Sequence, residues 1–142
     1  MKKGFLIILI LTFTSGFVQA QELGVRFGDI VGNNVAVDGV FGWKASRVHA
    51  DVSFGSGVGI EALYDFMYNR LGAEAFNYYI GLGVFTWLGS PFQLGVSSEL
   101  GIEYHFAGVP LALGLDWRPS LRIVDNTDFT VSRFGLNIRF VF

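Results

Sequence analysis

The last ten residues, 133–142, read Arg-Phe-Gly-Leu-Asn-Ile-Arg-Phe-Val-Phe. Successive side chains of a β-strand point to opposite faces, so this stretch predicts a strand with one apolar and one polar face. The apolar face carries Phe134, Leu136, Ile138, Phe140 and Phe142. The other face carries Arg133, Gly135, Asn137, Arg139 and Val141. A slip of one residue would move both arginines to the apolar side, so the register is strongly specified.

The same period of two residues recurs along the chain between turn residues, and it predicts eight strands. The expected strands are residues 22–30, 35–44, 47–55, 58–68, 76–88, 93–105, 111–120 and 130–142. The three prolines, Pro91, Pro110 and Pro119, fall in connections or near strand ends, where no ladder donor is needed. Because an even number of antiparallel strands closes a sheet without free edges, we expect an all-β, eight-stranded, antiparallel up-and-down transmembrane β-barrel.

The composition of the polar face favours a membrane barrel over a soluble exported barrel such as a lipocalin, which also alternates. A face exposed to water should be rich in Lys, Thr and Asn, whereas this face carries Gly, acids, Arg and His, which pair in a closed interior. Aromatic residues on the apolar face, including Tyr64, Tyr68 and Trp117, are expected to lie at the membrane interfaces.

The first twenty residues have the features of a secretory signal peptide. Lys2 and Lys3 precede an apolar stretch at 5–13, and Ala20 ends a small-residue cleavage site. That stretch is too short to cross a bilayer as a helix, which takes about 20 residues. We therefore expect a signal peptide at 1–20, a barrel domain at 21–142, and export to the outer membrane.

Charge and cysteine content exclude several classes of function. Without Lys2 and Lys3, eight basic and twelve acidic residues remain, a formal charge of −4, and no basic run is present. This argues against nucleic acid as a partner. The chain has no cysteine, so it has neither disulfides nor thiolate metal sites.

Charged residues on the predicted inner face form a candidate interior network. Its members are Arg26, Asp38, Asp51, Glu61, Asp65, Glu99, Glu103, Asp116, Arg118, Arg133 and Arg139. Glu22, Lys44, Arg47, His49 and His105 alternate onto the same face. Eight strands give an interior that side chains just fill, so we expect a packed polar core and a non-enzymatic structural or interaction role. The excess of acids leaves a second reading open, a narrow channel or transporter for ions or small solutes.

Sites for catalysis and metals are weakly supported. Glu99, Glu103 and His105 share one face of a strand, but they spread over about 20 Å at ~3.3 Å per residue, too far for one metal. A site assembled across strands, for example with His49 and Asp51, stays open. A lipid A-modifying enzyme would need a Ser/His pair near the outer rim, and we expect both histidines near the periplasmic ends. The sequence therefore predicts no catalytic, cofactor or metal-binding residue.

Three segments resemble small outer-membrane β-barrel proteins of Bacteroidota, and the architecture is similar to OmpX-type barrels. They are Gly-Ile-Glu-Ala-Leu-Tyr-Asp-Phe at 59–66, Pro-Leu-Ala-Leu-Gly-Leu-Asp-Trp-Arg-Pro at 110–119 and Gly-Leu-Asn-Ile-Arg-Phe-Val-Phe at 135–142. The resemblance implies fold and location, and it brings no catalytic residues. It also implies that Phe140 and Phe142 form the signal read by the barrel-insertion machinery. The expected partners are that machinery and outer-membrane lipid, with the protein a monomer.

Overall fold

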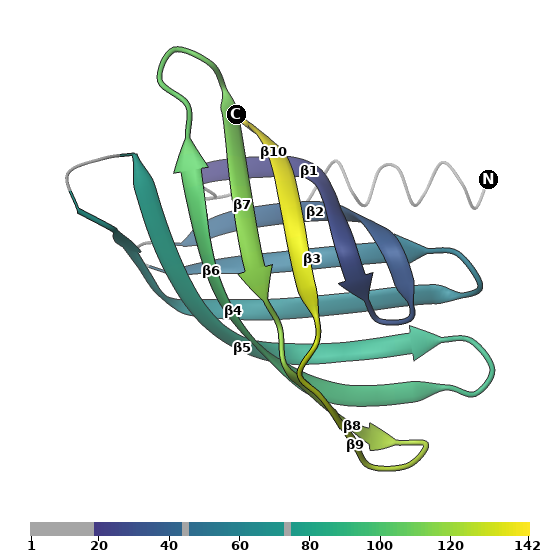
Figure 1. Ribbon diagram of the computed structural model, residues 1–142. Coiled ribbons are helices and arrows are strands. Elements are labelled where there is room, and N and C mark those ends of the chain that lie inside the picture. The colour runs from purple at the N-terminus through teal and green to yellow at the C-terminus, as the bar shows by residue number, and fades with distance from the viewer. Residues whose placement is uncertain (1–18, 44–45, 73–74) are drawn as a thin grey trace.

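Alternating side chains and frequent turn residues give a chain made of strands. The computed structural model describes residues 19–43, 46–72 and 75–142 (Figure 1). The strands are β1 Gln19–Ile30, β2 Asn33–Trp43, β3 Ser46–Phe54, β4 Val58–Arg70, β5 Phe76–Leu88, β6 Gln93–His105, β7 Leu111–Trp117, β8 Ser120–Val124, β9 Asp128–Thr130 and β10 Phe134–Val141. β1 begins inside the expected signal peptide, whose residues 1–18 lie outside the described part, as does Lys44. In the described part, no helix is long and apolar enough to span a membrane.

Neighbouring strands pair antiparallel around a closed ring. β1 to β6 follow one another, β7 continues the ring, and β10 lies between β7 and β1. The ring is sealed by β1 and β10, which pair from Glu22 with Val141 to Gly28 with Gly135. The prediction of an eight-stranded, antiparallel up-and-down barrel is confirmed.

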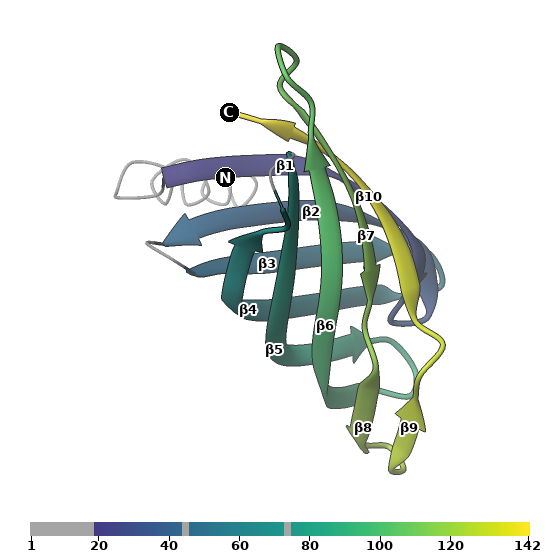
Figure 2. The ribbon, with the colours of Figure 1, turned by 60° about the vertical axis from the view of Figure 1, so that its left-hand side comes forward.

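The last two predicted strands, 111–120 and 130–142, are each broken in two. The break between β7 and β8 falls at Arg118 and Pro119 because proline has no N–H to donate to the ladder. β8 then pairs with the first residues of β6, from Ser97 with Ser120 to Leu94 with Val124. The β8–β9 hairpin extends beyond the β1–β2 hairpin at the same end of the barrel (Figure 2). We call this end, where the β1–β2, β3–β4 and β5–β6 turns also lie, the distal end, and the opposite end the proximal end.

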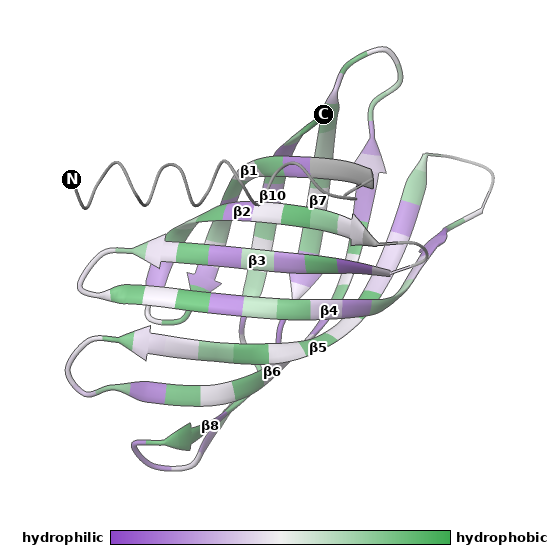
Figure 3. Cartoon of the chain, turned by 180° about the vertical axis from the view of Figure 1, so that it is seen from behind, coloured by the Kyte–Doolittle hydropathy of each residue, from purple (hydrophilic) through white to green (hydrophobic). Residues whose placement is uncertain are grey.

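The barrel is apolar outside and polar inside. Along β4 and β6, hydrophobic and hydrophilic residues alternate (Figure 3), and so does burial. Leu82 and Leu115, on the outer face, are 61% and 55% exposed, whereas Arg26 and Arg139, on the inner face, are 0% exposed. Soluble domains have the reverse distribution.

One expected outward aromatic, Tyr68, instead points into the barrel. The pairing of β4 with β5 shifts by one residue between Asp65 and Met67, which is a β-bulge at Phe66. A bulge adds a residue without adding a pair, so the alternation changes sides. Met67, expected inside, is consequently 36% exposed, and the Tyr68 ring lies over the Arg47 guanidinium. Tyr64, before the bulge, is outside as expected.

Glycines on the inner face make room for the largest inner side chains. A Cβ on Gly101 would lie 2.1 Å from Cζ of Tyr79, its direct cross-strand partner. A Cβ on Gly135 would lie 2.5 Å from Cζ of Arg26. The space that these glycines leave for large side chains explains why glycine recurs on the charged face of the strands.

Candidate functional site

The charged residues expected on the inner face meet inside the barrel. All eleven are buried, and the most exposed, Asp116, is only 4% exposed. Every strand of the ring except β5 carries at least one of them, and the remaining two, Arg118 and Arg133, lie just after β7 and just before β10. The network therefore joins parts of the chain that are far apart in the sequence.

Arg118 is the centre of this network. Its Nε donates to Glu99 at 2.9 Å, and its Nη1 donates to Glu61 at 2.9 Å and to Asp51. These three carboxylates lie on β6, β4 and β3, so one guanidinium group connects three strands of the barrel. All four side chains are fully buried.

Arg139 forms a second centre, closer to the proximal end. Its Nε donates to Glu22 at 2.7 Å, its Nη1 donates to Asp38 at 3.1 Å, and its Nη2 donates to Glu103. Glu22 and Asp38 lie on β1 and β2, beside the seam that β10 closes, while Glu103 lies on β6. Arg139 thus links the seam to β6, which lies two strands beyond β10 in the ring.

Two further arginines belong to the network. Arg26 pairs with Asp116 at 2.6 Å. Arg133 donates to both oxygens of Glu61, at 3.1 and 3.2 Å, and the Ser97 hydroxyl donates to the same carboxylate at 2.6 Å. Removal of one partner from a buried ion pair costs about 3–5 kcal/mol, so the loss of any one of these charges should destabilise the barrel.

Arg47 joins the network through contacts that the sequence did not reveal. Its Nε donates to Asp65 at 2.7 Å, and its guanidinium carbon lies 4.3 Å from the ring centroids of both Tyr68 and Tyr79. Such contacts contribute about 0.5–2 kcal/mol each. The inner position of Tyr79 beside Arg47 could have been inferred from its pairing with Gly101. That pairing is known only from the register of β5 and β6.

His49 lies deeper than expected. We expected it near the proximal ends, but it is fully buried beside Glu99, the middle residue of β6. Its Nδ1 lies 3.1 Å from Glu99 and its Nε2 contacts Asp38. The register of β3 against the far wall, which local alternation does not encode, sets this depth.

Three groups of side chains have the donor atoms of a metal site. They are Asp38 with His49 and Asp51, His49 with Asp65 and Glu99, and Glu22 with Glu103 and His105; within each, the ligand atoms lie within 4.8 Å of one another. The run of Glu99, Glu103 and His105 considered from the sequence is not among them. The fold therefore brings possible metal ligands together from different strands, which is the possibility that the sequence left open.

The distal end contains an apolar cluster and a polar cavity. Val31, Phe85 and Trp87 pack together on the inside. Next to them lies a cavity of about 310 Å³ whose lining includes Asp29, Arg122 and Arg133, so residues of the β1–β2 and β8–β9 hairpins both contribute. Arg133 lines this cavity and also pairs with Glu61, so the cavity borders the charged network directly.

No family model, curated protein or solved structure matches this chain.

Proposed function

We propose that this chain is a small, non-enzymatic β-barrel of the bacterial outer membrane, with a structural or interaction role. The observation that carries the proposal is the sidedness of the wall, where large apolar side chains cover the outside and paired charges fill the inside. Water-soluble monomers rarely expose an apolar patch larger than a few hundred Å². Hydrocarbon, in contrast, favours this outer surface and penalises open strand edges, which the closed ring lacks.

Two segments of the sequence also support the proposed location. The features of residues 1–20 support export, and the alternating strand that ends in Phe140 and Phe142 supports recognition by the barrel-insertion machinery. Phe140, on the outer side of β10, is 45% exposed, and Phe142, which follows the strand, is 71% exposed, so both rings are accessible to a partner. The segments quoted above support membership of the small barrel family of Bacteroidota, with the protein a monomer in lipid.

Cell fractionation tests the location. We expect the protein in the outer-membrane fraction, resistant to extraction by alkaline carbonate, and migrating differently on gels before and after heating. Recovery of the folded protein from the periplasm without detergent would overturn the proposal.

The filled interior supports a barrel that does not conduct. The guanidinium groups of Arg118 and Arg139 each bridge carboxylates from three strands across the lumen. An ion crossing the barrel would have to displace these pairs. We therefore expect no steady openings when the purified protein is added to planar lipid bilayers.

A narrow ion path is the second candidate, and one observation favours it. The described interior holds eight buried carboxylates against five buried arginines, so it attracts cations. Steady cation-selective openings that change in Glu99→Gln or Glu103→Gln would support this candidate and refute the closed barrel.

Lipid A modification is the third candidate, and the surroundings of His49 and Ser97 disfavour it. The partners of His49 are Asp38, Glu99 and two arginines, while the Ser97 hydroxyl donates to Glu61. We expect unchanged lipid A masses when the gene is deleted or overexpressed.

A further inference from the structure

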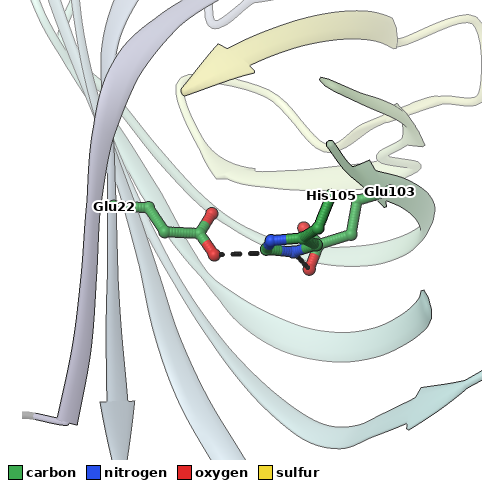
Figure 4. Close-up of side chains that lie close together, drawn as sticks. All are labelled: Glu22, Glu103 and His105. Carbon is green, nitrogen blue, oxygen red and sulfur yellow. Dashed lines mark hydrogen bonds and ion pairs between the residues drawn. The ribbon is translucent and has the colours of Figure 1, made fainter. Parts of the chain in front are cut away.

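Three side chains converge at the proximal mouth of the barrel. Glu103 and His105 are two residues apart on the inner face of β6, and Glu22 reaches them from β1 (Figure 4). His105 Nε2 lies 3.0 Å from Glu103 Oε1 and 3.8 Å from Glu22 Oε1. The Tyr68 hydroxyl lies 3.5 Å from the same nitrogen. Three oxygens thus face one nitrogen, although a single N–H donates well to only one of them.

These separations are close to the spacing of ligands around a zinc ion. Zinc binds imidazole nitrogen and carboxylate oxygen at about 2.0–2.2 Å, usually with tetrahedral geometry. The edge of such a tetrahedron, the distance between two ligand atoms, is roughly 3.3–3.6 Å. The separations of 3.0 and 3.8 Å from His105 Nε2 lie on either side of this range, so shifts of a few tenths of an ångström suffice.

Arg139 already holds the two carboxylates in the orientation that a metal requires. Its Nε donates to Glu22 Oε2 at 2.7 Å and its Nη2 donates to Glu103 Oε2, so the other oxygen of each carboxylate faces His105. Arg47 Nη1 donates at 2.9 Å to Glu103 Oε1, the oxygen that faces His105, and so occupies one of the two lone pairs of that oxygen and leaves the other for a metal. Ligating carboxylates in metal sites are commonly held by such outer hydrogen bonds.

This cluster is also the one that an ion can reach. The His105 side chain is 28% exposed, whereas His49, shared by the other two clusters, is fully buried and also contacts Arg118. Imidazole with carboxylates suits zinc better than calcium or magnesium, which prefer oxygen ligands alone.

We propose that Glu22, Glu103 and His105 bind a zinc ion at the proximal mouth, with the Tyr68 hydroxyl beside the fourth ligand position. The site goes beyond the proposed structural role and does not depend on it. It links β1, where the chain closes the ring, to β6, the third strand from it around the ring.

Zinc titration of the exported protein, purified in detergent, tests the site. We titrate Zn²⁺ against a chromophoric zinc indicator and expect one zinc per chain. Because loss of an outer-sphere partner alone weakens metal binding about 10–100-fold, His105→Ala and Glu22→Gln should each weaken it by more than about 100-fold. Glu22→Gln keeps an oxygen for Arg139, and heat-modifiable gel migration shows whether each variant is folded.

Asp128→Asn is the matched control, because Asp128 is an exposed acid on β9 at the opposite end. It should bind zinc like the unmodified protein. Two results would overturn the proposal. One is a folded barrel that binds no zinc. The other is His105→Ala binding zinc as tightly as the unmodified protein, which would place the ion among the clusters around His49.

Discussion

Leu82→Arg places a charge at the centre of the outer wall and tests the sidedness of the barrel directly. Leu82 is the middle residue of β5, is 61% exposed, and pairs with Tyr64, the middle residue of β4. If lipid surrounds this wall, an arginine near the midplane destabilises the folded barrel by about 2–4 kcal/mol. If water surrounds it, the same change on an exposed site costs within about 0.5 kcal/mol.

Leu71→Arg provides the matched control, because it is the same substitution at an equally open site. Leu71 follows β4 at the proximal turn and is 50% exposed, so it lies near an interface and the expected cost is about 0–1 kcal/mol. The assay is reversible urea unfolding of the barrel in lipid vesicles, followed by tryptophan fluorescence. Equal free energies of unfolding for the two variants, within about 0.5 kcal/mol, would refute an outer surface facing lipid.

Three further changes test the interior and the assembly signal. Arg118→Met removes the shared partner of three buried carboxylates and should lower the free energy of unfolding by at least about 3–5 kcal/mol in the same urea assay; a loss below 1 kcal/mol would contradict a tightly paired core. Gly101→Val fills the space of the Tyr79 ring, so we expect little folded barrel by gel shift, with recovery when Tyr79→Ala is added; no rescue would mean that the strand itself requires glycine. Phe142→Ala should lower the assembled fraction in cells while refolding into detergent is unchanged, and normal assembly in cells would argue against its signal role.

Alternation alone was enough to predict the strands and which face is apolar. Every member of the charged network was identified from its position in an alternating run, because a period of two fixes sidedness along any uninterrupted strand. The same rule placed the glycines on the inner face, whereas the large side chains beside Gly101 and Gly135 are known only from the structure.

The errors arose where pairing between strands overrides the local pattern. The bulge at Phe66 turns Tyr68 inward, where it stacks on Arg47, and no feature of residues 58–70 alone marks that extra residue. The break after Trp117 was signalled by Pro119, but the continuation of β8 along β6 was not. Two further features depend on how far each strand is shifted relative to its neighbours around the ring: the depth of His49, and the contact of Glu22 with His105. The sequence of a single strand does not reveal that shift.

The position of Arg139 bears on how the molecule assembles. Its bond to Glu22 spans 117 residues of sequence, so it forms only when the final strand arrives at the first. Closing a loop of this length costs conformational entropy, and the ion pair that offsets this cost forms only after the loop has closed. Until then Glu22, Asp38 and Glu103 lack their shared cation, and a chain shortened before Arg139 should remain an open, unfinished sheet that cellular proteases can recognise.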